Sequence, residues 1–175
     1  MSVTAQQRSL LRSVEEYSRL LENVSEEEFQ RSPGEGIWCY AQVYSHIFQA
    51  NLGSLIATEK CINGTAEINS DRLNWITGLI LLFGRFPPGK FKAPASIASM
   101  VSIISREEAR NMIVKFNNRI DYVAPRVSKS SAAQKIKHPR LGLLNAQQWF
   151  RFIQIHTLHH QKQLQRIGKL LKQSA

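Results

Sequence analysis

The sequence has few of the features that mark secreted or membrane proteins. It contains only two cysteines, Cys39 and Cys61, which is too few for a disulfide framework and is typical of a reducing compartment. The most apolar stretch, 75–86, contains polar and glycine residues and is too short to span a bilayer. Residues 1–11 show no secretory pattern. We therefore expect a cytoplasmic protein with no membrane partner.

Long runs of one charge are also missing, although the chain is strongly basic. Its 23 Lys and Arg residues exceed its 13 Asp and Glu residues, for a formal net charge of +10. The basic residues are scattered, with no run of five or more, so we do not expect nucleic acid as the partner. A dispersed basic surface keeps the protein in solution and can help to attract an anionic small substrate.

Alternating strand patterns are almost absent, and apolar residues instead repeat at helical spacing. Shorter helices are expected after Ser25, whose three following glutamates are typical of a capped first turn, and over 71–83, ended by Gly84. We expect Pro125 to end a helix, and 85–99 and 127–144 to be irregular. The pattern predicts one all-α domain over 1–175, which is a helix bundle with four long helices. We expect these at 3–24, 39–61, 106–122 and 146–173, and Asn145 caps the last of them.

Three histidines fall on the inward faces of these helices. His156 and His160 are one turn apart on the apolar stripe of the last helix, so they point the same way. His46 lies among small residues that include Gly53, which indicates either a closely packed neighbouring helix or space above a bound metal. An unpaired buried imidazole costs about 1–3 kcal/mol, and one shared divalent ion would satisfy all three rings.

Other polar residues fit this site less well. Thr157 and Leu158 occupy the place where a helical zinc protease carries its glutamate, and 146–173 contains no Asp or Glu. Glu59 lies more than three turns beyond His46, so we do not expect it to be a ligand. His159 is about 100° from the stripe and is interpreted as a boundary residue, and His138 as a loop residue. Three protein ligands would leave an open position, as in catalytic rather than structural zinc sites.

Two segments resemble the DinB-like superfamily of DinB/YfiT type: Trp38-x7-His46-Ile47 and His156-x2-His159-His160-x2-Gln163-Leu164. The resemblance implies a four-helix bundle in an up-down-down-up arrangement with one or two short extra helices. It also implies a divalent metal, zinc or nickel, held by His46, His156 and His160. The family often has glycine where Lys162 stands, which bears on the rim of the site and not on its ligands.

The resemblance extends to residues around the expected ligands. Gln163 matches a frequent family glutamine, which either orients a ligand or faces a neighbouring helix. Trp38 matches a tryptophan at the start of the second helix and is expected to anchor the core. Phe91, Lys92 and Pro94 resemble a family loop that approaches the pocket.

The superfamily includes thiol transferases, thiol-dependent isomerases and hydrolases. The resemblance therefore implies an enzyme that activates a water or a low-molecular-weight thiol to act on a small-molecule substrate. Arg85, Lys90, Lys92 or Lys162 could hold an anionic thiol cofactor. The alternative is a non-catalytic binding or stress-response protein whose metal is structural or absent. A homodimer fits a bundle of this size, but the sequence does not show which face would pair.

Overall fold

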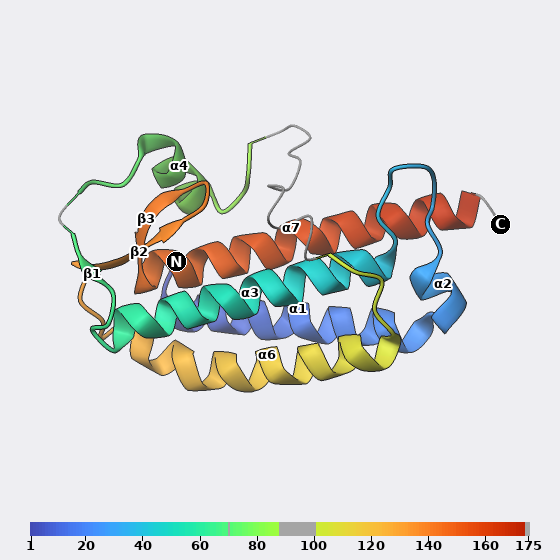
Figure 1. The fold of residues 1–175 in the computed structure, drawn as a ribbon, viewed down its shortest axis with the longest axis horizontal. Helices are drawn as coiled ribbons and strands as arrows, with labels where there is room; N and C mark the ends of the chain where they lie inside the picture. Colours follow the sequence, from blue (N-terminus) through green and yellow to red (C-terminus); the bar gives the residue numbers. More distant parts are fainter. Residues whose placement is uncertain (70, 88–100, 174–175) are drawn as a thin grey trace.

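A computed structural model describes residues 1–69, 71–87 and 101–173, and within these ranges it contains six helices and three short strands. Figure 1 shows four long helices side by side, with α2 at one end of the bundle and α4 and the strands at the other. The long helices are α1 (Val3–Asn23), α3 (Tyr40–Ile62), α6 (Arg106–Val127) and α7 (Ala146–Gln173). The shorter elements are α2 (Glu26–Gln30), β1 (Glu67–Ile68), α4 (Trp75–Phe83), β2 (Gln134–His138) and β3 (Gly142–Asn145).

The direction of the long helices confirms the expected up-down-down-up bundle. In Figure 1, α1 and α7 run one way, whereas α3 and α6 run the other. Helix α3 packs against α6 and α7, and α1 packs against the same two helices. The parallel pair α3 and α6 is joined by the long connection that carries β1 and α4, and α3 and α7 meet as antiparallel neighbours.

Local hydrogen bonds account for where the last two long helices begin. The Ser105 hydroxyl accepts the Glu108 amide at 3.1 Å, and the Glu108 carboxylate accepts the Ser105 amide at 2.7 Å. Asn145 and Gln148 make the equivalent reciprocal pair ahead of α7, at 3.0 and 2.9 Å. Both caps satisfy amides that the first helical turn leaves unpaired. The expected starts of these helices are therefore confirmed.

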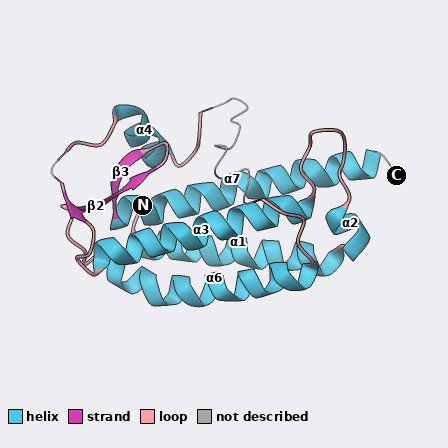
Figure 2. Cartoon of the chain, viewed as in Figure 1, coloured by secondary structure: helices cyan, strands magenta, loops and turns pink. Residues whose placement is uncertain are grey.

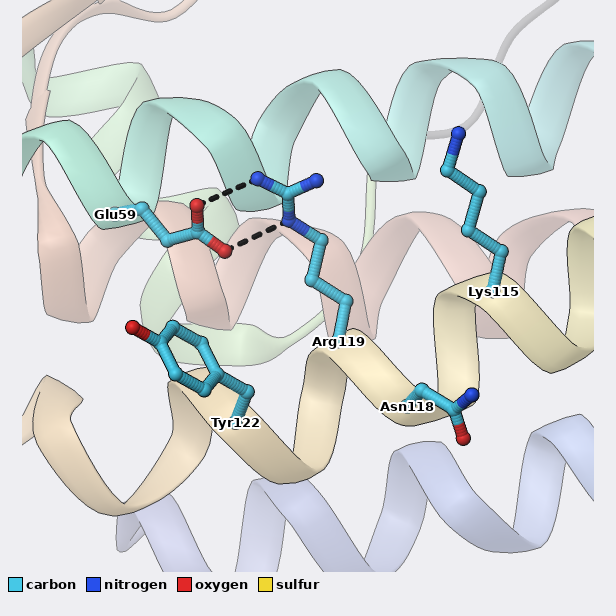
Figure 3. A pocket seen from close by; sticks show the side chains of 5 residues that line it. All are labelled: Glu59, Lys115, Asn118, Arg119 and Tyr122. Atoms are coloured by element: carbon cyan, nitrogen blue, oxygen red, sulfur yellow. Dashed lines mark hydrogen bonds and ion pairs between the residues drawn. The ribbon is translucent and has the colours of Figure 1, made fainter.

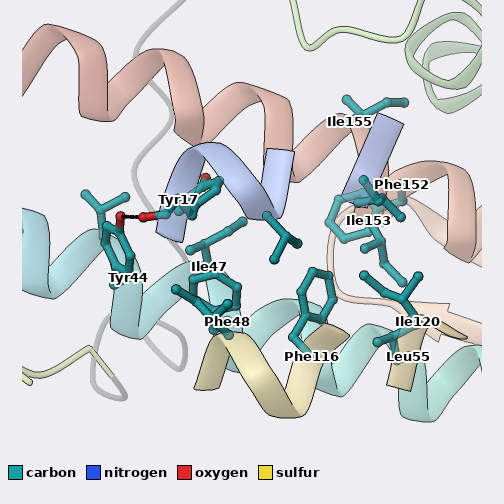
Figure 4. Close-up of a cluster of buried hydrophobic side chains, with 14 of the residues drawn as sticks. Tyr17, Tyr44, Ile47, Phe48, Leu55, Phe116, Ile120, Phe152, Ile153 and Ile155 are labelled. Carbon is teal, nitrogen blue, oxygen red and sulfur yellow. Dashed lines mark hydrogen bonds between the residues drawn. The ribbon is translucent and has the colours of Figure 1, made fainter. Parts of the chain in front are cut away.

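The core fills the centre of the bundle with aromatic and branched side chains from all four long helices (Figure 4). Tyr17 packs edge-to-face against Tyr44 and Phe48, with ring centroids 5.3 and 5.4 Å apart, and the Tyr44 and Phe48 rings are tilted relative to each other at 5.9 Å. The Tyr44 hydroxyl donates to the Tyr17 carbonyl, and the Tyr17 hydroxyl donates to the carbonyl of Thr157 on α7. These bonds satisfy the buried phenols and tie α1 to both α3 and α7.

Two expectations about the segment after 122 are wrong. Helix α6 continues through Pro125 to Val127, because Val123 and Val127 are fully buried and their packing holds the last turn despite the lost amide. The segment 127–144 is not all loop, because β2 and β3 form a hairpin and β1 pairs with β2 (Figure 2). These strands are two to five residues long, and lysines interrupt the apolar pattern of β2.

The prediction that Gly53 marks a close approach of another helix to α3 is also wrong. Gly53 is exposed, and a Cβ added there would meet no atom within 4 Å. The close approach lies instead at Gly168 on α7, where an added Cβ would lie 2.6 Å from the Tyr40 hydroxyl. Glycine here lets the end of α7 pack directly on the start of α3.

Helix α4 is attached to the rest of the protein by two of its side chains and by one of its backbone carbonyls. The Thr77 hydroxyl donates to the Leu141 carbonyl at 3.0 Å, and Ile80 is buried beside it. The Arg151 Nε donates to the Leu81 carbonyl at 3.0 Å. Gly84 ends the helix in the left-handed conformation, at φ 67°, as expected.

Among the described residues, no helix combines the length and apolarity needed to cross a membrane.

Candidate metal centre

The structure brings His46, His156 and His160 together between α3 and α7. His46 comes from the second turn of α3, and the other two lie one turn apart in the middle of α7. All three are buried, and one ligand atom from each lies within 4.8 Å of the others. No other group of three such side chains forms a potential metal site in the described ranges. The nitrogen atoms are therefore close enough for a single ion to bind all three.

A chain of hydrogen bonds fixes the orientation and tautomer of His156. The Thr157 hydroxyl donates to the Ile153 carbonyl at 2.7 Å, so it accepts from the Asn51 amide group at 2.8 Å. This leaves the Asn51 Oδ1 facing the His156 Nδ1 at 3.0 Å. Because that oxygen can only accept, Nδ1 carries the proton and Nε2 carries the lone pair.

The His160 ring is held by a different amide. Its Nδ1 lies 2.7 Å from Gln163 Oε1, one turn along α7. Gln163 thus contacts the ring of a candidate ligand. Such contacts orient metal-binding histidines and raise their basicity. The Nε2 atoms of His156 and His160 face each other at 3.0 Å.

The pKa values of the three rings decide whether they are in the form that can bind a cation. Burial lowers the pKa of His160 to about 3 and that of His46 to about 4, with neighbouring histidines adding to the effect. Burial also lowers the pKa of His156 well below its usual range. At neutral pH the three rings are uncharged, which is the form that binds metal.

The surroundings of His46 fit its role as the third candidate ligand. Its Nδ1 is buried without a hydrogen-bond partner, and its ring lies 4.8 Å from the His160 ring and 5.3 Å from the His156 ring. Tetrahedral zinc bound to imidazole nitrogens at ~2.1 Å would separate them by roughly 3.3 Å. The residues present therefore fit a divalent ion with small movements of three side chains.

Aromatic rings surround the three histidines. Trp38 is half-buried, with its ring 5.3 Å from that of His46, so it packs beside the site in addition to anchoring the start of α3. Phe152 stacks on His156 at 5.2 Å with an interplanar angle of 17°. Phe86, which follows α4, presents its ring to His156 at 6.4 Å and to His159 at 5.2 Å. These rings exclude water and keep the imidazoles in an apolar setting.

The remaining histidines lie outside the three-ligand group. His159 is exposed, and its ring lies 5.1 Å from that of His160, so it stands at the rim of the site as a boundary residue. His138 ends strand β2, and its Nδ1 accepts the amides of Arg140 and Leu141 at 3.1 Å. Burial lowers the pKa of His138 to about 4, and its ring packs on Phe152 rather than on a ligand.

Glu59 forms an ion pair away from the three histidines. Its carboxylate accepts the Arg119 Nε at 2.7 Å and Nη2 at 2.5 Å, which joins α3 to α6 (Figure 3). The pair lines an open polar pocket of about 380 Å³ with Lys115, Asn118 and Tyr122. No carboxylate joins the histidine group among the described residues, so a fourth protein ligand of this type is not seen there.

Sequence reasoning missed Asn51 and the two phenylalanines. Asn51 could have been found as a polar residue on the inward face of α3, and Phe152 as the residue four before His156 on the same stripe. Phe86 carried no signal, because its contact with the histidines depends on how the connection after α4 folds. Lys90, Phe91, Lys92 and Pro94 lie outside the described residues.

Several comparisons with known proteins agree with this architecture. A YfiT from Bacillus subtilis, described as a probable metal-dependent hydrolase with an unusual four-helix bundle topology, has a TM-score of 0.61 at 11% identity. That match covers 98% of this chain and 87% of the other. A mycothiol-dependent maleylpyruvate isomerase has a TM-score of 0.65 at 14% identity, with 94% of this chain and 61% of the other covered. The four-helix bundle protein TT2238 has a TM-score of 0.52 at 16% identity, with 94% and 99% covered.

These likenesses establish the fold, since all three identities are low. None of the curated proteins compared with the chain matches it. The family model of the DinB superfamily matches residues 9–164, which include all three candidate ligands and Gln163. The chain belongs to the DinB superfamily.

Proposed function

We propose that this protein is a divalent-metal-dependent enzyme whose ligands are His46, His156 and His160. The observation that carries the proposal is the convergence of three buried rings, with one ligand atom from each within 4.8 Å of the others and the Nε2 atoms of His156 and His160 3.0 Å apart. The Nδ1 of His46 is buried without a hydrogen-bond partner, which adds a polar atom that the chain leaves unsatisfied. Zinc and nickel are the ions we favour, because imidazole nitrogen suits both.

The surrounding residues prepare this site for chemistry. Asn51 and Gln163 contact the Nδ1 atoms of the two α7 imidazoles, which leaves both Nε2 atoms facing inward. Trp38, Phe86 and Phe152 lower the local polarity around the rings, which strengthens electrostatic interactions inside the site. A divalent ion with three protein ligands supplies an open position, where it lowers the pKa of a bound water or thiol.

Two reactions fit this arrangement. Hydrolysis of a small substrate is supported by the description of YfiT as a probable metal-dependent hydrolase. Thiol transfer is supported by the mycothiol dependence of the isomerase, and by the exposed cations Lys162 and Arg166 beside His159, which suit an anionic thiol. We place the protein in the cytoplasm, acting on a small molecule as a monomer or homodimer.

A screen of two reactions tests the proposal and chooses between them. Tag-free protein loaded with zinc or nickel is assayed against a panel of activated esters, and against an electrophilic acceptor in the presence of a low-molecular-weight thiol. We expect turnover in one assay, lost in His160→Ala and kept in Glu59→Gln. A thiolate-to-metal charge-transfer band in cobalt-loaded protein would favour thiol transfer.

The alternative is a non-catalytic binding or stress-response protein with a structural or absent metal. It predicts stoichiometric metal, or none, with no turnover in either assay. It also predicts that added thiol leaves the cobalt spectrum unchanged, since a structural site has no open position.

A further inference from the structure

Helix α4 presents an apolar face that the bundle does not cover. Thr77 and Ile80 turn toward the protein, whereas Trp75, Leu82 and Phe83 on the opposite side are 72%, 72% and 64% exposed. The helix carries no charged residue, and Figure 1 shows it set on the outside of the bundle near the first turns of α7. Exposed apolar surface on this scale is a common mark of a binding site.

This face forms one wall of a groove of about 600 Å³. Ile76, Leu79 and Phe83 line it from α4, and Arg85 and Phe86 line it from the segment that follows. The volume is within the usual range for sites that bind small molecules, and the lining is mostly apolar. The groove is thus suited to the apolar body of a small ligand.

Phe86 connects this groove to the candidate metal centre. Its side chain lines the groove, while its ring lies 5.2 Å from the His159 ring and 6.4 Å from the His156 ring. A single aromatic ring therefore separates the groove from the histidines. A ligand in the groove would have one end within a few ångströms of the rim of the site.

The charges around the groove favour an anion. Arg85 is exposed in its lining, and none of the described lining residues is acidic. At the rim of the site, Lys162 and Arg166 are exposed cations on α7 that interact electrostatically with His159. The whole chain carries a formal net charge of +10, which favours the approach of an anion to the protein.

We infer that the groove beside α4 is a substrate subsite, which holds the aromatic or branched apolar body of a small carboxylate next to the three-histidine centre. Arg85 pairs with the carboxylate, and the α4 side chains cover the apolar body. The inference rests on the proposed function for its catalytic meaning, but binding to the groove can be measured without metal.

The first experiment measures binding to metal-free protein by fluorine NMR, with trifluoromethyl-phenylbutyrate as the probe and its primary amide as the uncharged analogue. We expect Leu79→Ser to weaken both probes about fivefold through lost apolar contact. Arg85→Gln should weaken the carboxylate about fivefold and leave the amide unchanged. Val114→Ser and Lys115→Gln on α6 are matched controls and should change neither affinity.

The second experiment asks whether the groove adjoins the histidine centre. In cobalt-loaded protein, the bound probe should show faster fluorine relaxation than in zinc-loaded protein. In metal-free protein, the probe should shift the imidazole signals of His159, identified with His159→Gln. If the chain binds no metal, the proposed function fails, while the His159 signals still decide whether the groove adjoins the site.

Three results would overturn the inference. The first is a probe affinity that neither Leu79→Ser nor Arg85→Gln changes. The second is binding at the groove with no effect on cobalt-dependent relaxation or on His159. The third is a dimer in sedimentation that Leu79→Ser converts to monomer, because the α4 face would then be an interface between two copies of this chain.

Discussion

Helix α3 takes part in two polar clusters that satisfy their groups in different ways. Toward α6, Glu59 and Arg119 form a two-point ion pair in which each charge meets its opposite. Toward α7, His46 joins two neutral imidazoles whose Nε2 atoms lie 3.0 Å apart. The first cluster is completed by the chain itself. We propose that an added cation completes the second, which is the difference between a structural contact and a candidate reactive site.

The largest effect should come from removing a candidate ligand. His46→Ala, His156→Ala or His160→Ala should each weaken zinc binding about a thousandfold or more, equivalent to about 4 kcal/mol, because one of three metal bonds is lost. Elemental analysis and calorimetric titration of tag-free protein measure this. Glu59→Gln, which alters the self-complete cluster, should keep about one metal per chain. Metal kept by all three histidine variants would contradict the assignment.

A second effect concerns acid stability without metal. Burial lowers the pKa of His46 to about 4, whereas an unfolded histidine has a pKa near 6.5. The unfolded chain therefore binds the proton first, so the stability is present above pH 6.5 and is lost as the pH falls toward 4. This single group accounts for up to about 3 kcal/mol of the free energy of unfolding.

Urea unfolding at several pH values, in the presence of a chelator, measures this loss. Between pH 6.5 and 4, His46→Leu should lower the number of protons taken up on unfolding by up to one. The ion-pair cluster should not contribute in this range through Arg119, because its hydrogen bond with Glu59 raises its pKa further. An unchanged pH dependence in His46→Leu would show that His46 is not buried as a neutral ring.

A smaller effect should come from the amide that orients a ligand. Gln163→Ala removes the oxygen 2.7 Å from the His160 Nδ1, so the ring loses the contact that orients it. We expect metal affinity to fall about 10- to 100-fold with the stoichiometry unchanged. Gln163→Glu, which keeps an acceptor at the same place, should restore most of the affinity. Equal losses in both variants would point to packing rather than to hydrogen bonding.

The difference between the clusters also explains what sequence could predict. The periodicity of the long helices and the four-residue spacing of His156 and His160 are local properties, so they predicted the bundle and the pair on one face. The position of His46 on the inward face of its own helix extended the predicted site across two helices. The contacts of Asn51 and Phe86 with the histidines depend on how separate segments pack. The strands were missed because they are short, and the last turn of α6 because buried Val127 outweighs Pro125.

The smallest effect should be at the ion pair itself. The side chains of Glu59 and Arg119 are 19% and 31% exposed, so water screens part of their attraction. A double-mutant cycle with Glu59→Gln and Arg119→Met should give a coupling free energy of about 1 kcal/mol or less in thermal or urea unfolding. Zinc affinity should be the same in all four proteins, because neither residue belongs to the three-histidine group. If zinc affinity falls in each single variant and returns in the double variant, then α3 couples the two clusters. The position of His46 would then depend on the contact that α3 makes with α6.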